Sequence, residues 1–185
     1  MTFTRSVWCC CCLLAISAPA VYAAESGNLR AGAARIDITP AKEPPLPMSG
    51  YAGRGPHQGI RDNIFVRAIV LDDGSSRAAI VACEVIGFPE PVWDEVAGCI
   101  AKETGIPREN ILLAGVHTHE APSPALVTSD MEPGRAAYLR KLYDSIVDAA
   151  RRATRMPSTG RARISARWTS WAASSERRRC AWPAK

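Results

Sequence analysis

The feature that most constrains this chain is a short apolar run followed directly by two histidines. Residues 111–115 read Ile-Leu-Leu-Ala-Gly, and His117 and His119 come next, ahead of Pro122. An apolar run of this length bounded by turn residues predicts a buried strand. Residues two apart in an extended backbone point to the same side, so we expect both imidazoles to emerge together where the strand ends.

Two histidines placed in this way are suited to bind a metal ion. Neutral imidazole is the commonest protein ligand for zinc, and a catalytic zinc site usually takes three protein ligands and leaves one position open for water. The chain has only three histidines, and two of them are His117 and His119. The pattern alone leaves two interpretations open: a metal site, or a hydrogen-bonded pair of loop histidines without metal.

The first 23 residues have the pattern of a secretory signal peptide. Arg5 supplies a positive charge, residues 7–16 form an apolar run, and residues 21–23 offer a small-x-small cleavage site ahead of Ala24. The apolar run is too short to span a membrane. We therefore expect the mature protein to begin near Ala24 and to be secreted or periplasmic.

Removal of this segment would leave three of the seven cysteines, Cys83, Cys99 and Cys180. An odd count gives no disulfide framework, and at most one bridge is possible. Cys83 ends a predicted strand and Cys99 lies in a predicted helix, so we expect both to be packed thiols and not a disulfide pair or metal ligands.

The segments that follow the predicted signal peptide have the pattern of an α/β domain. Residues 33–40 alternate like an edge strand that stops at Pro40. Residues 64–71 and 77–83 form a predicted hairpin, because the intervening Asp-Asp-Gly-Ser-Ser segment favours a turn. Both runs are apolar at nearly every position, so we expect the sheet to be covered on both faces.

Two helices complete this pattern. Pro89 and Pro91 open the first, and Gly105 ends it. The second runs from about Glu132 to Thr154. Their predicted inner stripes are Val92, Trp93, Val96 and Ile100 in the first, and Tyr138, Leu139, Leu142, Tyr143, Ile146, Val147 and Ala150 in the second. The alternation predicts a mixed, layered sheet with helices packed on it.

A long loop rich in proline and glycine spans residues 41–60. Loops of this length inside compact domains are commonly functional. Met48, Tyr51 and His57 are therefore candidates to line a pocket. The alternative is a surface excursion with one buried tyrosine.

Several motifs together resemble a known family. They are residues 31–40, the loop motif Met48-Ser49-Gly50-Tyr51, Gly59-Ile60-Arg61-Asp62, and Gly115-Val116-His117-Thr118-His119 followed by Pro122. In this order and spacing they resemble the neutral/alkaline non-lysosomal ceramidases, with residues 24–157 as the N-terminal part of the catalytic domain. The resemblance implies a zinc-dependent amidase that cleaves the N-acyl bond of ceramide-like lipids. It also implies that His117 binds the zinc and that His119 is catalytic beside it.

The chain departs from this family in two ways. Glu120, Ala121 and Ser123 stand where the family usually has small polar residues and glycine. The remaining zinc ligands and a catalytic serine lie further downstream in the family than these 185 residues reach, and His57 lies too far upstream to replace one. We therefore expect an incomplete site and a fragment that is inactive alone. Two other metal families fit less well: Ala121 replaces the aspartate of the metallo-β-lactamase motif, and an amidohydrolase barrel would begin with its histidine pair.

Residues 158–185 form a basic tail that we interpret as frame-shifted or disordered. Residues 151–185 hold ten Arg or Lys and one acid, so the first 150 residues are mildly acidic despite the formal net charge of +5. The alternative function is a non-catalytic secreted binding module whose tail, with tryptophans among its arginines, contacts anionic lipid or nucleic acid. Under the ceramidase interpretation, the expected partners are a ceramide-like lipid and a membrane surface, not nucleic acid. The oligomeric state is left open.

Overall fold

The computed structural model describes residues 29–155, so the predicted signal peptide, Cys180 and the predicted tail lie outside the described residues. One four-stranded sheet and two helices make up this part of the chain. The elements are β1 (Arg30–Asp37), β2 (Phe65–Asp72), β3 (Arg77–Cys83), α1 (Glu90–Thr104), the 3-10 turn η1 (Arg108–Asn110), β4 (Ile111–Gly115) and α2 (Pro133–Ala153). The predicted α/β fold with a mixed sheet is confirmed.

The strands lie in the spatial order β1-β2-β3-β4. β2 pairs antiparallel with both β1 and β3, and β4 pairs parallel with β3 after the crossover through α1. β1 is an edge strand, as predicted, but it covers residues 30–37 and not 33–40. The ion pair between Arg30 and Asp72, at 2.8 Å, accounts for the early start, since it ties the beginning of β1 to the end of β2.

The predicted hairpin is confirmed, and two aspartates hold its turn. Asp72 accepts a hydrogen bond from the Gly74 backbone N–H at 2.8 Å, and Asp73 accepts one from Ser75 at 2.8 Å. Such side-chain bonds to the backbone stabilise the reversal of the chain. The bond from Gly74 and the neighbouring Arg77 guanidinium lower the pKa of Asp72 below its ordinary value.

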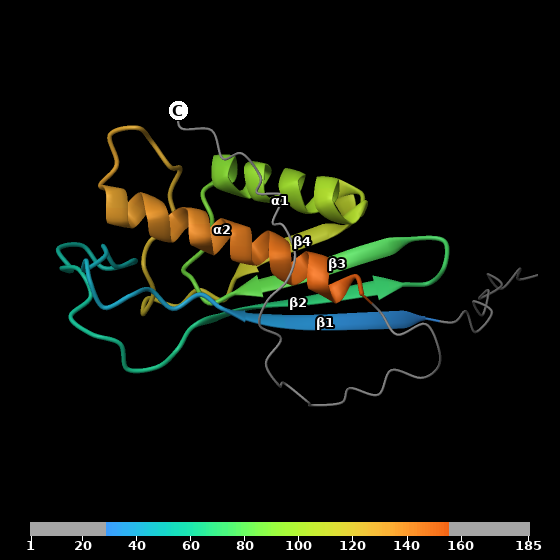
Figure 1. Ribbon diagram of the computed structural model, residues 1–185, viewed down its shortest axis with the longest axis horizontal. Coiled ribbons are helices and arrows are strands. Elements are labelled where there is room, and N and C mark those ends of the chain that lie inside the picture. Colours follow the sequence, from blue (N-terminus) through green and yellow to red (C-terminus); the bar gives the residue numbers. More distant parts are fainter. Residues whose placement is uncertain (1–28, 156–185) are drawn as a thin grey trace, which may run out of the picture.

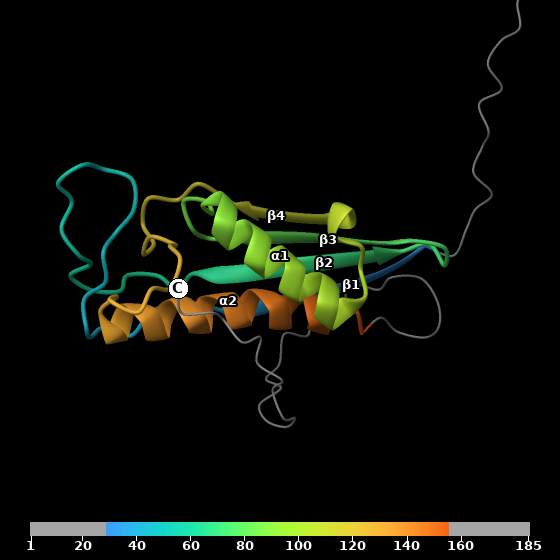
Figure 2. The same cartoon turned by 90° about the horizontal axis from the view of Figure 1, so that it is seen from above.

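Both helices pack on the same face of the sheet (Figures 1 and 2). α1 begins after Pro89 and ends at Gly105, whose φ of 70° is the left-handed helix cap that glycine adopts without strain. The Glu132 carboxylate caps α2 by accepting from the backbone N–H of Gly134 at 2.9 Å and of Arg135 at 2.8 Å. Fully buried aliphatic side chains between the helices and the sheet form the core: Val66, Val70, Val81, Val92, Val96, Ile100, Leu139, Leu142 and Ile146.

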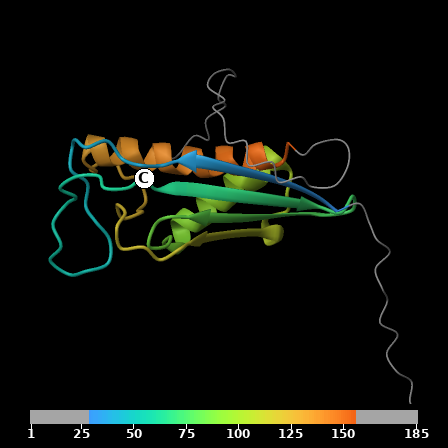
Figure 3. The same cartoon turned by 90° about the horizontal axis from the view of Figure 1, so that it is seen from below.

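The opposite face of the sheet carries no helix of the described residues (Figure 3). Ile69, Ile80 and Leu112 lie side by side across β2, β3 and β4 and are 45%, 43% and 58% exposed. The prediction that the sheet is covered on both faces is therefore wrong for the described residues. Apolar strands indicate that a face is suited to burial, but they do not supply the layer that would bury it.

Neither Cys83 nor Cys99 is in a disulfide within the part of the chain that the structure describes. Cys83 is fully buried, and this burial raises the pKa of its thiol to about 12, so it acts as a packing residue and not as a thiolate ligand. Among residues 29–155, no helix is both long enough and apolar enough to cross a membrane.

Candidate active site

The two histidines lie at the end of the sheet where β1, β3 and β4 finish. Two long loops, residues 38–64 and 116–132, meet at this end of the molecule (Figure 1). Backbone contacts join them: Met48 forms a bridge with Pro122, and the Ser49 N–H donates to the Ala121 carbonyl at 3.3 Å. The predicted Pro/Gly loop is therefore packed against the histidine loop and is not a detached surface excursion.

His117 leaves the strand in a conformation that the sequence did not indicate. Its φ is 66°, in the left-handed region, so the extended backbone predicted through the histidine pair is wrong. The His117 N–H donates to the Val85 carbonyl at 3.1 Å, which holds the bend against the segment after β3. A strained backbone at a non-glycine residue costs roughly 1–3 kcal/mol, and such residues cluster at functional sites.

The same segment fixes the imidazole of His117. Its Nδ1 lies 2.9 Å from the Ile86 backbone carbonyl oxygen. A carbonyl oxygen only accepts hydrogen bonds, so Nδ1 must carry the proton, and in the neutral ring Nε2 keeps its lone pair. A backbone carbonyl that holds one ring nitrogen in this way is the usual support of a histidine that binds metal through the other nitrogen.

His119 lies beside His117, with the ring centroids 5.3 Å apart and the planes at 81°. The Tyr51 ring lies against it with a centroid distance of 4.5 Å. Gly50, at a φ of 101°, passes so close that a Cβ there would overlap the His119 ring. The Nδ1 atom of His119 is buried without a hydrogen-bond partner among the described residues. Of the two ring nitrogens of His119, Nδ1 is therefore closed off from solvent.

An arginine from the Pro/Gly loop holds the backbone of the histidine loop. The Arg54 guanidinium donates to the His119 carbonyl oxygen at 2.7 Å and to the Glu120 carboxylate at 2.9 Å. The bond from Arg54 lowers the pKa of Glu120. Sequence reasoning missed Arg54 and the Ile86 carbonyl, because backbone acceptors and contacts 65 residues apart leave no local pattern.

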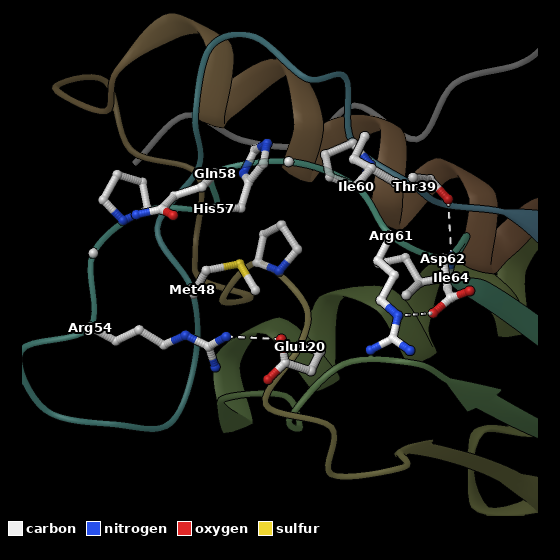
Figure 4. Close-up of a pocket in the computed structure, with 15 residues that line it drawn as sticks. Thr39, Met48, Arg54, His57, Gln58, Ile60, Arg61, Asp62, Ile64 and Glu120 are labelled. Atoms are coloured by element: carbon white, nitrogen blue, oxygen red, sulfur yellow. Dashed lines mark hydrogen bonds and ion pairs between the residues drawn. The ribbon is translucent and has the colours of Figure 1, made fainter.

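A cavity of about 610 Å³ lies next to this site (Figure 4). Met48 and His57 line it, as predicted, whereas Tyr51 does not and is 65% exposed. His57 has the opposite tautomer to His117, because its Nδ1 accepts from the Leu46 N–H at 2.9 Å and its proton is therefore on Nε2. The buried Nε2 has no partner among residues 29–155.

The described residues fit part of a zinc site. Among them, no group of three or more His, Cys, Asp or Glu side chains could hold a metal ion. Within residues 29–155, no third side chain of these types therefore completes a metal site with His117 and His119. The chemistry of His117 nevertheless fits a metal, since its Nε2 lone pair is free and its ring is anchored from behind. Complete binding would need ligands from outside residues 29–155.

The fold and site together define an α/β domain with a histidine pair at the end of its sheet where β1, β3 and β4 finish. The family model for the N-terminal part of the neutral/alkaline non-lysosomal ceramidases matches residues 29–182 of this chain. The chain therefore belongs to the neutral/alkaline non-lysosomal ceramidase family, and the predicted resemblance is confirmed.

A solved structure shares this fold. Neutral ceramidase from Pseudomonas aeruginosa matches with a TM-score of 0.56 and 23% sequence identity over 70% of this chain and 22% of that chain. A ceramidase complexed with C2 matches with a TM-score of 0.49 and 25% identity over 68% of this chain and 20% of that one. This chain thus spans about a fifth of the length of the solved ceramidases that it matches. The comparisons do not favour the alternative of a non-catalytic binding module.

Proposed function

We propose that this chain carries one part of the active site of a secreted, zinc-dependent amidase that hydrolyses the N-acyl bond of ceramide-like lipids. Membership of the ceramidase family supports the reaction class. The single observation that carries the zinc assignment is the bond from His117 Nδ1 to the Ile86 carbonyl, which leaves Nε2 free as a ligand. Zinc, when bound, supplies a Lewis acid that polarises carbonyl groups and lowers the pKa of water.

The residues of this chain would have separate roles in that reaction. His117 would hold the metal through Nε2. His119, 5.3 Å away between ring centroids, would place its Nε2 against an oxygen of the scissile amide and hold or move a proton there. Tyr51 and Gly50 enclose the other side of its ring, so water would have little access to Nδ1.

Membership of the family and the neighbouring cavity support the proposed substrate. The cavity combines apolar side chains such as Met48, Ile60 and Ile64 with polar groups such as Gln58, a mixture suited to an amphipathic ligand. We propose a ceramide-like lipid, reached at a membrane surface, as that ligand.

A chimera tests this proposal. Residues 29–155 would replace the matching segment of neutral ceramidase from Pseudomonas aeruginosa, the protein whose fold this segment shares. The chimera should hydrolyse a fluorogenic ceramide, and His117→Ala should abolish turnover while Lys102→Ala, at an exposed position of α1, retains it. A folded chimera whose turnover survives His117→Ala would contradict the assignment. The isolated chain should show no turnover above its own His117→Ala variant, because its described residues supply too few ligands.

A further inference from the structure

The geometry points to a clamp on His119. We propose that the segment from Gly50 to Arg54 fixes the position of the His119 imidazole, with Tyr51 and Arg54 as positioning residues. The clamp itself follows from contacts within this chain, and its relevance to catalysis rests on the proposed function of His119.

The ring of His119 is held from two sides. Tyr51 lies against it at a centroid distance of 4.5 Å with an interplanar angle of 36°, and the Gly50 backbone fills the space next to Nδ1. Tyr51 is 65% exposed, so burial of its own ring does not explain why it is placed there. The contact with His119 is the ring contact that orients the Tyr51 side chain.

The backbone of His119 is held by Arg54. Its guanidinium makes two bonds to consecutive residues of the histidine loop, one to the His119 carbonyl at 2.7 Å and one to the Glu120 carboxylate at 2.9 Å. The Arg54 side chain is 28% exposed and that of Glu120 is 74% exposed. A planar guanidinium fixes direction as well as distance, which a lysine in its place would not do.

The two histidines of the site therefore have independent supports. His117 is anchored to Val85 and Ile86, which follow β3. His119 is anchored to Tyr51 and to Arg54, which belong to the loop after β1. Loss of the clamp should consequently move His119 and leave His117 in place, and a purely structural role of the loop would not produce this selectivity.

Nuclear magnetic resonance of the metal-free, histidine-labelled chain tests the clamp. The chain has only three histidines, so their ring Cε1–H signals can be assigned with single His→Gln variants. Tyr51→Leu should displace the His119 signal much more than that of His117, whose ring lies 5.3 Å away between centroids, while Tyr51→Phe, which keeps the ring, should leave both. Arg54→Ala should act like Tyr51→Leu. Arg61→Ala is the matched control, since Arg61 lies in the same loop with a side chain that is 97% exposed.

Reactivity of His119 toward diethylpyrocarbonate gives a second measurement. The rate should rise about three- to tenfold in Tyr51→Leu and Arg54→Ala, the range expected when a partly exposed ion pair and one ring contact hold a loop. It should also rise in the unmodified protein at high salt, which screens the pair between Arg54 and Glu120. The salt series needs no variant and decides the matter if a variant does not fold.

An unchanged His119 signal and an unchanged rate in these experiments would overturn the clamp. Displacement of His117 by the same extent as His119 would also overturn it, because the supports would then not be independent. A zinc titration of the same variants separates the two proposals: a displaced His119 in a chain whose His117 does not bind zinc would leave the clamp standing and refute the proposed function.

Discussion

His117 donates its Nδ1 proton to the backbone carbonyl oxygen of Ile86 across 2.9 Å, and this bond selects the nitrogen that faces the site. His57, in the neighbouring cavity wall, has the reverse arrangement, because its Nδ1 accepts from the Leu46 N–H. In their neutral forms these two histidines are therefore opposite tautomers, and only that of His117 offers a free Nε2 lone pair to a metal.

The two tautomers can be measured directly. With both rings neutral and no metal present, ¹⁵N chemical shifts should show His117 protonated on Nδ1 and His57 protonated on Nε2. The physical reason is that a carbonyl faces Nδ1 of the first and an N–H faces Nδ1 of the second. Finding the same tautomer in both rings would contradict the assignment of Nε2 as the ligand atom of His117.

Gly50 should tolerate no side chain, because its Cβ would overlap the His119 ring and its φ of 101° disfavours other residues. Gly50→Ala should lower the free energy of unfolding by about 2–4 kcal/mol, combining backbone strain and overpacking. Gly53→Ala is the control: its φ is 75° but a Cβ meets nothing within 4 Å, so only strain of about 1–2 kcal/mol applies. Equal losses in urea unfolding would show that His119 does not occupy the space above Gly50.

Two adjacent leucines of β4 test the two faces of the sheet. Leu113 is 5% exposed and points into the core, so Leu113→Ala should cost about 2–5 kcal/mol of unfolding free energy. Leu112 is 58% exposed on the face without helices, so Leu112→Ala should change stability by no more than about 0.5 kcal/mol.

Leu112→Ala should also reduce concentration-dependent association in sedimentation experiments, because it shrinks an exposed apolar row. Association that is unaffected by Leu112→Ala would argue against this face as its cause.

The elements of the fold could be predicted from the sequence because their signals are local. Helix α2 was expected over about 132–154 and spans Pro133–Ala153, since Pro133 and a capping Glu132 define its start. The cover on the outer face of the sheet could not be predicted from Ile80 and Leu112, because burial of a face depends on which other segments pack there. β1 began earlier than predicted through the tertiary contact of Arg30 with Asp72.

The candidate site was predictable only in outline. The spacing of His117 and His119 indicated that the two rings lie together, and they do, but through a left-handed bend and not through an extended strand. Their supports come from Ile86 and Arg54, which are distant in sequence and carry no motif. Local patterns report side-chain chemistry and period, whereas contacts to backbone atoms are decided by tertiary packing.

Acid unfolding should depend on Asp72. Hydrogen bonding to the Gly74 N–H and to Arg77 lowers the pKa of Asp72 below its ordinary value of 3.8. A carboxyl group with a lowered pKa in the folded state contributes stability above its unfolded pKa, and that contribution is lost as the pH falls through the folded pKa. Asp72→Asn should therefore lower stability near neutral pH and flatten its dependence on pH below about 4. Asp62→Asn, whose side chain is 86% exposed, serves as the control, and a pH profile that Asp72→Asn leaves unchanged would exclude this role.

Isothermal titration of the untagged, metal-free chain with zinc tests the central claim most directly. We expect one weak site, well short of the roughly 10–16 kcal/mol typical of complete structural zinc sites, because His117 and His119 lack a third such ligand among the described residues. His117→Ala should abolish this binding, and His57→Ala, which removes the histidine of the opposite tautomer, should leave it unchanged. Zinc binding that persists in His117→Ala, or no zinc binding by the unmodified chain, would contradict the account.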